Sequence, residues 1–271
     1  MQPVDYLFLF TPNNSGSTVM CQYLAAQTGG YLPPFGNNEG QMAPGVREMM
    51  RTRPWDPDSR FDWTAIHAEW DRLAGKAGKT LFIEGSPPNL MRIEAIRAEF
   101  GPRARFACAV SHPYMQVASS VYNYRKPGGM RLKGLAELWL TQAGALAAAL
   151  EADPALALVS YEDFCEDPTR LNAAYGLPVV EGAEIAGKWN TRDTAIRNAA
   201  ARTIAFLTAE EIDRLAGALA AVPEIPARFG YALEDGAACL ARLSAEADLF
   251  AEGLARRRLW EEAGGRPPRR R

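Results

Sequence analysis

A short polar loop between an apolar run and a helical pattern holds the residues best suited to chemistry. Residues 11–18 read Thr-Pro-Asn-Asn-Ser-Gly-Ser-Thr and follow the apolar run 6–10. The run is typical of a buried parallel strand, and a helical apolar pattern begins after the loop. Unpaired backbone N–H groups and the positive end of a helix dipole meet at a helix N-terminus. The sequence therefore predicts an oxyanion cradle at Ser15, Gly16, Ser17 and Thr18.

The loop departs from the pattern of loops that bind nucleoside triphosphates. A Walker A loop needs glycine, four residues, glycine, lysine and then serine or threonine. Thr11 takes the first glycine position here, and Ser17 takes the lysine position. A magnesium- and ATP-dependent kinase is therefore disfavoured. For the loop taken alone, a serine-rich helix cap without a ligand remains an alternative.

Composition limits the classes of partner. The chain has 271 residues, 48% of them hydrophobic, which suffices for a large core in a single domain. Its formal net charge of −2 argues against nucleic acid, so an anion site must be local. Four cysteines without C-x-x-C spacing and two histidines form no usual zinc pattern, so no metal is expected. No apolar run reaches about 18 residues, which predicts a cytoplasmic protein without a membrane span.

Short apolar runs alternate with helical patterns along the chain. Strands are expected at 6–10, 80–83, 105–110 and 156–160, and an alanine- and leucine-rich helix at 135–150. This alternation predicts a central parallel sheet flanked by helices.

Residues 29–58 are rich in Gly, Pro and Asn and are predicted to form a lid or substrate-binding segment, with a short helix near 46–51. We call residues 29–58 the lid segment. Asp62, Ser86 and Thr208 are placed to begin helices as N-caps. Arg92 is expected to point outward from its helix. The basic residues 256–271 are predicted to be a solvated or disordered tail.

Four segments, in order, resemble motifs of the PAPS-dependent sulfotransferases. Residues 14–18 match four of the five positions of the family's 5′-phosphosulfate loop, in which lysine or arginine precedes Ser-Gly-Thr/Ser-Thr. Residues 84–88, Glu-Gly-Ser-Pro-Pro, resemble its Glu-Lys-Ser/Thr-Pro segment, with Gly85 in place of the lysine. Residues 161–164 and 229–231 resemble its Tyr-Glu-Asp-Leu and Leu-Gly-Tyr segments. The resemblance implies a three-layer, P-loop-like α/β fold, with residues 1–271 as one domain.

A further motif concerns the 3′-phosphate of the donor. The family has an arginine, an acidic or amide residue and a proline, with a serine eight positions after the arginine. Pro113 and Ser119 fall in register, whereas Ser111 and His112 stand at the arginine and acidic positions. The resemblance implies that Ser111 and Ser119 contact the 3′-phosphate, and His112 is expected to help hold it if its ring is protonated. It also implies that Asn13 and Asn14 join the 5′ cradle, and that a basic segment closes over the donor through Lys188, Arg192 and Arg197.

The resemblance implies transfer of a sulfuryl group from PAPS to a hydroxyl or amine of a small-molecule acceptor. The first candidate for the base is Glu84, at the carboxyl end of a predicted parallel strand, and the second is Glu39 in the lid segment. Apolar residues in the lid segment predict a partly hydrophobic acceptor. The sequence predicts no oligomeric state.

Two cationic positions of the family's donor site are neutral in this chain. Asn14 replaces the loop cation, and Ser111 replaces the 3′-phosphate arginine. Loss of one such donor commonly costs about 10²–10³ in rate. Two hypotheses therefore stay open. The chain is an active sulfotransferase with compensating cations, or it has the fold with a diverged donor site that binds another nucleotide or anion, or is non-catalytic.

Overall fold

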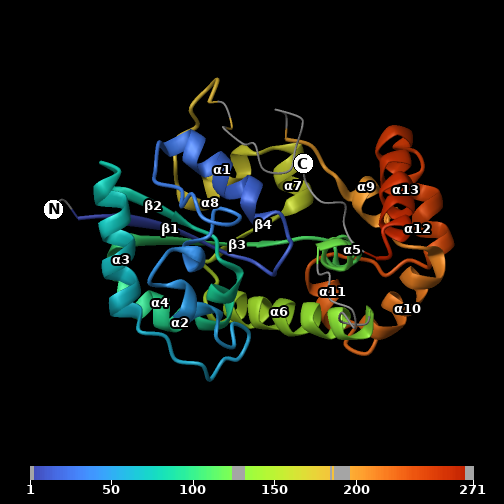
Figure 1. Ribbon diagram of the computed structural model, residues 1–271, viewed down its shortest axis with the longest axis horizontal. Helices are drawn as coiled ribbons and strands as arrows, with labels where there is room; N and C mark the ends of the chain where they lie inside the picture. Colours follow the sequence, from blue (N-terminus) through green and yellow to red (C-terminus); the bar gives the residue numbers. More distant parts are fainter. Residues whose placement is uncertain (1–2, 124–131, 184, 186–195, 266–271) are drawn as a thin grey trace. The chain divides into compact units, whose positions relative to one another are not determined.

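The computed structural model describes residues 3–123, 132–183, 185 and 196–265. The chain divides into two compact units (Figure 1). The first comprises Met1–Val110 and Ala148–Ile196, and the second comprises Ser111–Ala147 and Arg197–Arg271. The two units are described separately below, and the organisation of the chain as a single domain stays a prediction.

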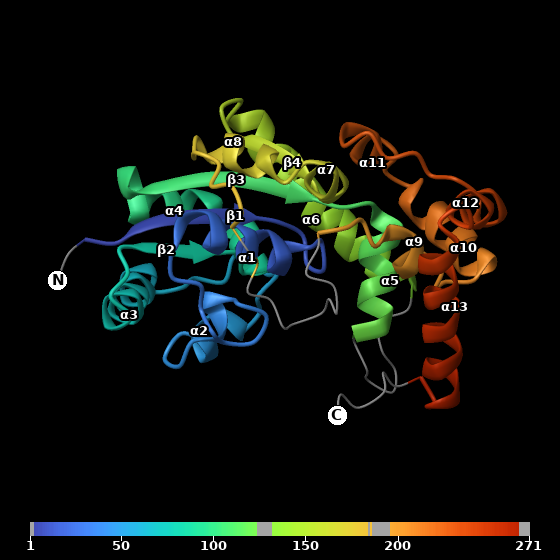
Figure 2. The ribbon, with the colours of Figure 1, turned by 90° about the horizontal axis from the view of Figure 1, so that it is seen from above.

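The described part of the first unit contains a four-stranded parallel sheet, as predicted. Its strands lie in the order β2-β1-β3-β4, which Figure 2 shows side by side. The chain leaves the central strand β1 for β2 on one side and later returns to β3 on the other. A topological switch point therefore lies between the carboxyl ends of β1 and β3, where open α/β sheets bind ligands. The strands are β1 (Asp5–Phe10), β2 (Leu81–Glu84), β3 (Ala104–Val110) and β4 (Ala157–Ser160).

Helices cover both faces of this sheet, which makes three layers (Figure 1). One face carries α1 (Ser17–Thr28), α7 (Tyr161–Glu166) and α8 (Thr169–Tyr175). The other face carries α3 (Trp63–Lys76) and α4 (Ile93–Phe100).

The side chains of β1 divide between the two faces because successive residues of a strand point to opposite sides. The rings of Tyr6 and Phe8 lie 4.6 and 4.8 Å from the ring of Phe100 on α4. Leu7 and Leu9 are fully buried as well. Burial on both sides explains why the strand reads as an unbroken apolar run.

The lid segment is built from short elements and is attached to the sheet. The N–H of Tyr31 donates to the carbonyl of Leu81 at 2.7 Å, which extends the edge beside β2. The 3₁₀ helix η1 (Gly40–Met42) and the helix α2 (Arg47–Arg51) follow. The predicted short helix is thereby confirmed.

Arg92 does not point outward as predicted. It ends the 3₁₀ helix η2 (Pro87–Arg92) and is buried. Its guanidinium donates to the carbonyls of Pro54 and Asp56 at 2.8 and 2.7 Å and lies over the ring of Phe61. The prediction extended an α-helical period back through this turn, but a 3₁₀ turn has about three residues, which changes the facing direction. Arg92 therefore fastens the end of the lid segment.

The described part of the second unit is helical. Its helices are α5 (Pro113–Asn123), the first part of α6 (Leu132–Ala152), α9 (Ala200–Ile204), α10 (Ala209–Leu219), α11 (Glu224–Arg228), α12 (Gly236–Leu243) and α13 (Ala247–Glu262). Because α13 runs to Glu262, the first residues of the predicted basic tail are helical. None of the helices in the described ranges is both long and apolar enough to cross a membrane.

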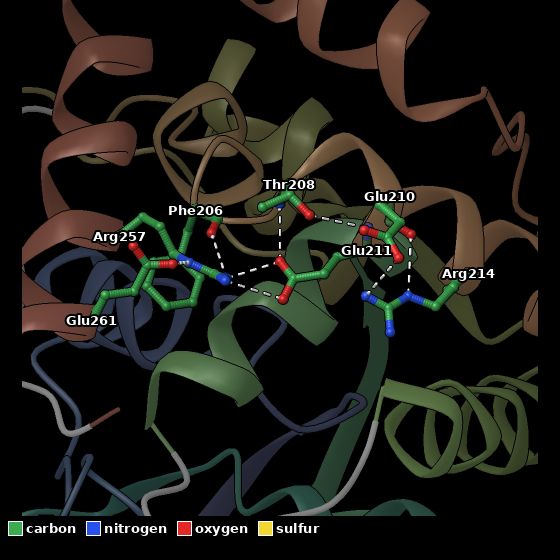
Figure 3. Close-up of polar contacts among 7 residues, drawn as sticks. All are labelled: Phe206, Thr208, Glu210, Glu211, Arg214, Arg257 and Glu261. Atoms are coloured by element: carbon green, nitrogen blue, oxygen red, sulfur yellow. Dashed lines mark hydrogen bonds and ion pairs between the residues drawn. The ribbon is translucent and has the colours of Figure 1, made fainter. Parts of the chain in front are cut away.

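The N-terminus of α10 carries the predicted capping box (Figure 3). The hydroxyl of Thr208 accepts from the N–H of Glu211 at 3.2 Å, and the Glu211 carboxylate accepts from the N–H of Thr208 at 2.9 Å. Arg257 of α13 donates to the same carboxylate at 2.8 Å. The capping box thus also joins α10 to α13.

We expect Thr208→Ala to lower the free energy of unfolding by about 1 kcal/mol, because an N–H of α10 then loses its acceptor. Urea denaturation of the full chain measures this. Thr141→Ala, on the exposed side of α6, is the control and should have little effect. Equal losses in the two variants would show that the cap adds no stability.

Candidate functional site

The loop that joins β1 to α1 has the backbone shape of an anion cradle. Asn14 and Gly16 adopt left-handed conformations, with φ angles of 61° and 86°. Left-handed residues in a turn direct successive N–H groups toward one point. Within the described part of the chain, no side chain caps α1, which has 12 residues, and its first turn has no acidic residue. Among these residues, no capping side chain offsets the positive end of the α1 dipole.

A buried hydroxyl lies within this loop. Ser15 is fully buried, and its Oγ has no hydrogen-bond partner among the described residues. Ser17 is buried as well, whereas Asn13 and Thr18 are half-buried. Buried polar atoms are nearly always hydrogen-bonded, and an unpartnered one marks a place for a water or ligand oxygen. The predicted cradle residues thus belong to one loop at the N-terminus of α1.

The ring of Tyr161, the first residue of α7, packs against Gly16. A Cβ atom on Gly16 would lie 2.3 Å from Cδ2 of Tyr161. Glycine is therefore required for two separate reasons, the space and the left-handed φ. The sequence of residues 161–164 indicates only a resemblance to a family segment. It does not predict that Tyr161 contacts the loop.

Glu84 ends β2, and its side chain is fully buried. One carboxylate oxygen accepts from the N–H of Gly40 at 2.8 Å. The other accepts from the N–H of Ser86 at 2.8 Å and from Nδ2 of Asn89 at 2.9 Å. Contrary to the prediction, the hydroxyl of Ser86 does not cap a helix, because it accepts from the N–H of Gln41 at 3.0 Å. These bonds fasten the lid segment to the end of β2.

Glu39 lies beside this attachment, just before η1. It is half-buried, and burial raises its pKa. The charge of Glu39 also contributes to the raised pKa values of Glu84 and of Cys21 on α1, so the three side chains lie near one another.

Gly85 brings the end of β2 against the first turns of α1. A Cβ atom on Gly85 would lie 2.5 Å from Sγ of Cys21 and 3.8 Å from Cβ of Ser17. A lysine, which the sulfotransferase motif has here, would need Cys21 to move. Both candidate bases thus lie close to the N-terminal part of α1.

Burial raises the pKa of Glu84 from its ordinary value of 4.5 to about 7, and the N–H donors of Ser86 and Gly40 oppose this rise. Between these values the folded state binds a proton that the unfolded state has lost. We therefore expect the contribution of Glu84 to stability to be fully present below pH 4.5 and to be lost as the pH rises to about 7.

Urea denaturation across this pH range measures the effect, with Glu84→Gln as the comparison. The variant cannot ionise, so its stability should fall less steeply with pH than that of the parent chain. Exposed Glu94→Gln should keep the parent slope. If the free energy of unfolding depends on pH in the same way in Glu84→Gln and in the parent chain, the expectation is wrong.

Two predicted donor contacts, Ser111 and His112, begin the second unit. Ser111 is fully buried, and its Oγ lacks a partner among the described residues. Burial, followed by the nearby charge of Arg242, lowers the pKa of His112 to about 4. His112 is therefore uncharged at neutral pH, so the protonated ring on which its predicted phosphate contact depends is not present at that pH. Its Nδ1 accepts from the N–H of Tyr114 at 3.2 Å.

The other predicted donor contacts are placed as follows. Ser119 is half-buried on α5. Arg197 is ion-paired with Glu252 at 3.9 Å. Arg192 and Lys188 lie outside the described residues. Within the described ranges, no three His, Cys, Asp or Glu side chains form a group that could hold a metal ion.

Fold and loop together define the class of protein. This is an α/β protein of P-loop-like type, with helices on both faces of a parallel sheet and a loop that joins the central strand to the N-terminus of α1. The class follows from the position of the loop, which begins at the carboxyl end of β1 beside the switch point.

Three solved structures are similar to the chain. A sulfotransferase domain from the curacin biosynthetic pathway is 18% identical, over 73% of this chain and 81% of its own, with a TM-score of 0.44. A sulfotransferase domain of the Synechococcus PCC 7002 olefin synthase is 17% identical, over 67% and 76%, with a TM-score of 0.44. Sulfotransferase STF1 from Mycobacterium tuberculosis H37Rv is 16% identical, over 67% and 70%, with a TM-score of 0.44.

Neither a protein-family model nor a curated protein matches the sequence. The three similar structures are named as sulfotransferases, the family whose motifs the sequence resembles. What the chain binds has to be inferred from its own residues.

Proposed function

We propose that the chain transfers a sulfuryl group from PAPS to a hydroxyl or amine of a small, partly hydrophobic acceptor. The observation that supports this most is the N-terminus of α1, which no side chain of the described residues caps and which follows two left-handed residues. The unpartnered hydroxyl of Ser15 lies in the same loop. A 5′-phosphosulfate presents the oxyanions that such N–H groups and hydroxyls bind.

The proposed transfer is an in-line displacement at sulfur. The bond between sulfur and the bridging oxygen breaks while the acceptor oxygen or nitrogen bonds to sulfur, and adenosine 3′,5′-bisphosphate leaves. The cradle residues 15–18 hold the phosphosulfate, and Asn14 donates to the bridging oxygen as negative charge develops there. Hydrogen bonds to charged groups are about twice as strong as neutral ones, so Asn14 stabilises this charge less than a lysine would.

The acceptor proton passes to a carboxylate, and Glu39 suits this role better than Glu84. Glu84 is fully buried, and both of its oxygens already accept N–H bonds. Glu39 is partly exposed and accepts a hydrogen bond from Nε2 of Gln41, and its raised pKa makes it a stronger base than an ordinary glutamate. In this proposal Glu84 is a positioning residue, because its bond to the N–H of Gly40 fixes the backbone next to Glu39.

Ser111, Ser119 and Arg192 are proposed to hold the 3′-phosphate, with His112 as a neutral hydrogen-bonding group. The uncharged state of His112 and the neutral Asn14 also favour a second candidate function. In this alternative the same cradle binds another nucleotide or anion, and no sulfuryl group is transferred.

Isothermal titration with adenosine 3′,5′-bisphosphate tests the proposal, and AMP is the comparison ligand. We expect micromolar binding of the bisphosphate and at least about tenfold weaker binding of AMP, because AMP lacks the 3′-phosphate. No detectable heat with millimolar bisphosphate would exclude a PAPS enzyme. Equal affinities for the two ligands would favour the second candidate function.

A further inference from the structure

Two arginines in the second unit form ion pairs with one carboxylate, and a third arginine lies near it. Nη1 of Arg202 on α9 lies 3.4 Å from Glu252 on α13, and Nη2 of Arg197 lies 3.9 Å from the same carboxylate. Arg256 follows Glu252 by one helical turn, so it shares its face of α13. Glu252 is 49% exposed, which weakens its pairing with each arginine. The group therefore carries more positive than negative charge among the described residues.

Arg202 is more enclosed than Arg197, which is 43% exposed. Its side chain is 13% exposed, and its Nε is buried without a hydrogen-bond partner among the described residues. A guanidinium offers five N–H donors and no acceptor, and leaving such a donor unpaired inside a protein costs free energy. An oxygen acceptor supplied from outside the chain would remove this cost.

Arg256 is held close to Arg202. Its guanidinium lies over the ring of Tyr122 on α5, 5.8 Å from the ring centre. Burial and the nearby charge of Arg202 both lower the pKa of Arg256. Two guanidinium groups that repel each other this way are stabilised when an anion binds between them.

A tight helix contact brings the two arginines together. A Cβ atom on Gly253 of α13 would lie 2.4 Å from the carbonyl oxygen of Arg202 and 2.7 Å from Cβ of Ala205. Glycine thus lets α13 approach α9 at this point, and Arg256 lies three residues further along α13. The close approach of the α13 and α9 backbones therefore places Arg256 near Arg202.

The next arginine of α13 shows the contrasting case (Figure 3). Arg257 donates to Glu211 at 2.8 Å, to Glu261 at 2.6 Å and to the carbonyl of Phe206 at 3.3 Å. Its side chain is 18% exposed, which is similar to the exposure of Arg202. A structural arginine in this unit is thus paired through several donors, as Arg202 is not.

We propose that Arg202 and Arg256 form a binding site for the phosphate or sulfate group of a small organic ester. The planar fork of a guanidinium matches two oxygens of such a group, and two arginines together match its double charge. The ring of Tyr122 supplies an apolar wall for the organic part of the ester. This site uses none of the residues of the α1 cradle, and it does not rest on the proposed transfer reaction.

Thermal unfolding of the full chain tests the site, with inorganic phosphate as the probe and chloride at equal ionic strength as the reference. We expect phosphate to raise the midpoint, because a ligand that binds the folded state stabilises it. The dissociation constant derived from the titration should rise at least about tenfold in Arg202→Gln and in Arg256→Gln. It should fall in Glu252→Gln, which removes the competing carboxylate.

Exposed Arg258→Gln, on the same helix, is the matched control and should bind phosphate as the parent chain does. Inorganic sulfate should act like phosphate. Because substitution of Arg202 removes a buried group, Arg256→Lys is a second variant, and it should bind phosphate at intermediate strength.

If phosphate raises the unfolding midpoint no more than chloride does, the proposed site is wrong. The site is also wrong if Arg258→Gln loses as much phosphate affinity as Arg256→Gln, because the attraction is then nonspecific. Gly16→Ala separates the two sites of the protein. If the phosphate shift disappears in Gly16→Ala and persists in Arg256→Gln, phosphate binds at the α1 cradle, and the arginine site is wrong while the proposed function stands. If the shift persists in Gly16→Ala and the parent chain binds no nucleotide, only the arginine site remains.

Discussion

Replacement of Gly16 by alanine is expected to weaken the binding of adenosine 3′,5′-bisphosphate by at least about 100-fold. The new Cβ would lie 2.3 Å from the ring of Tyr161, so the loop or the ring has to move. The left-handed φ of 86° adds strain of roughly 1–2 kcal/mol. Both effects displace the N–H groups that converge on the proposed phosphosulfate. Isothermal titration measures the loss.

Gly29→Ala is the matched control for this substitution. Gly29 ends α1 and also has a left-handed φ of 65°, but a Cβ atom added there would meet none of the described residues within 4 Å, apart from its chain neighbours. It should therefore lose about 1 kcal/mol of stability while binding the bisphosphate normally. The double variant of Gly16→Ala with Tyr161→Ala should recover part of the binding, because the clash is gone. Unchanged affinity in Gly16→Ala would show that the loop does not hold the nucleotide.

Glu39→Gln is expected to lower kcat for sulfuryl transfer by about 10²–10⁴ and to leave the affinity for the bisphosphate nearly unchanged. The glutamine keeps the size of the side chain and its place beside Gly40 but cannot take the acceptor proton. Steady-state kinetics with PAPS and a phenolic acceptor measures kcat, and titration measures the affinity. Exposed Glu48→Gln on α2 is the control and should act as the parent chain does.

Glu84→Gln should have a different signature from Glu39→Gln. An amide NH₂ at this position would face the N–H donors that now point at the carboxylate, so the lid segment loosens. We expect faster hydrogen exchange of the Gly40 and Gln41 amides together with a lower kcat. If Glu84→Gln lowers kcat with unchanged exchange, and Glu39→Gln does not lower it, then Glu84 is the base.

Local sequence patterns predicted much of the fold. The four strands, the short helix of the lid segment and the capping box at Thr208 depend on neighbouring residues, so propensity and spacing suffice to place them. The β1–loop–α1 unit is also local, because the glycine and the short polar residues determine its turn. These predictions are confirmed by the structure.

Long-range contacts were missed because sequence spacing does not record them. Arg92 binds carbonyls 36 and 38 positions earlier in the chain, and the Ser86 hydroxyl accepts an N–H 45 positions earlier. Local patterns predict that Arg92 is a surface charge and that Ser86 caps a helix. Each side chain instead hydrogen-bonds with backbone groups of the lid segment, which are distant in the sequence.

The order and type of the residues were enough to predict the parallel sheet, the cradle loop and the identity of two candidate carboxylates, because these depend on short-range patterns. How the two carboxylates differ became visible only in the folded chain. Burial and three N–H donors make Glu84 an anchor of the lid segment, and partial exposure leaves Glu39 suited to act as a base. The physical reason is that desolvation and hydrogen bonding, which set the behaviour of an ionisable group, come from residues distant in the chain.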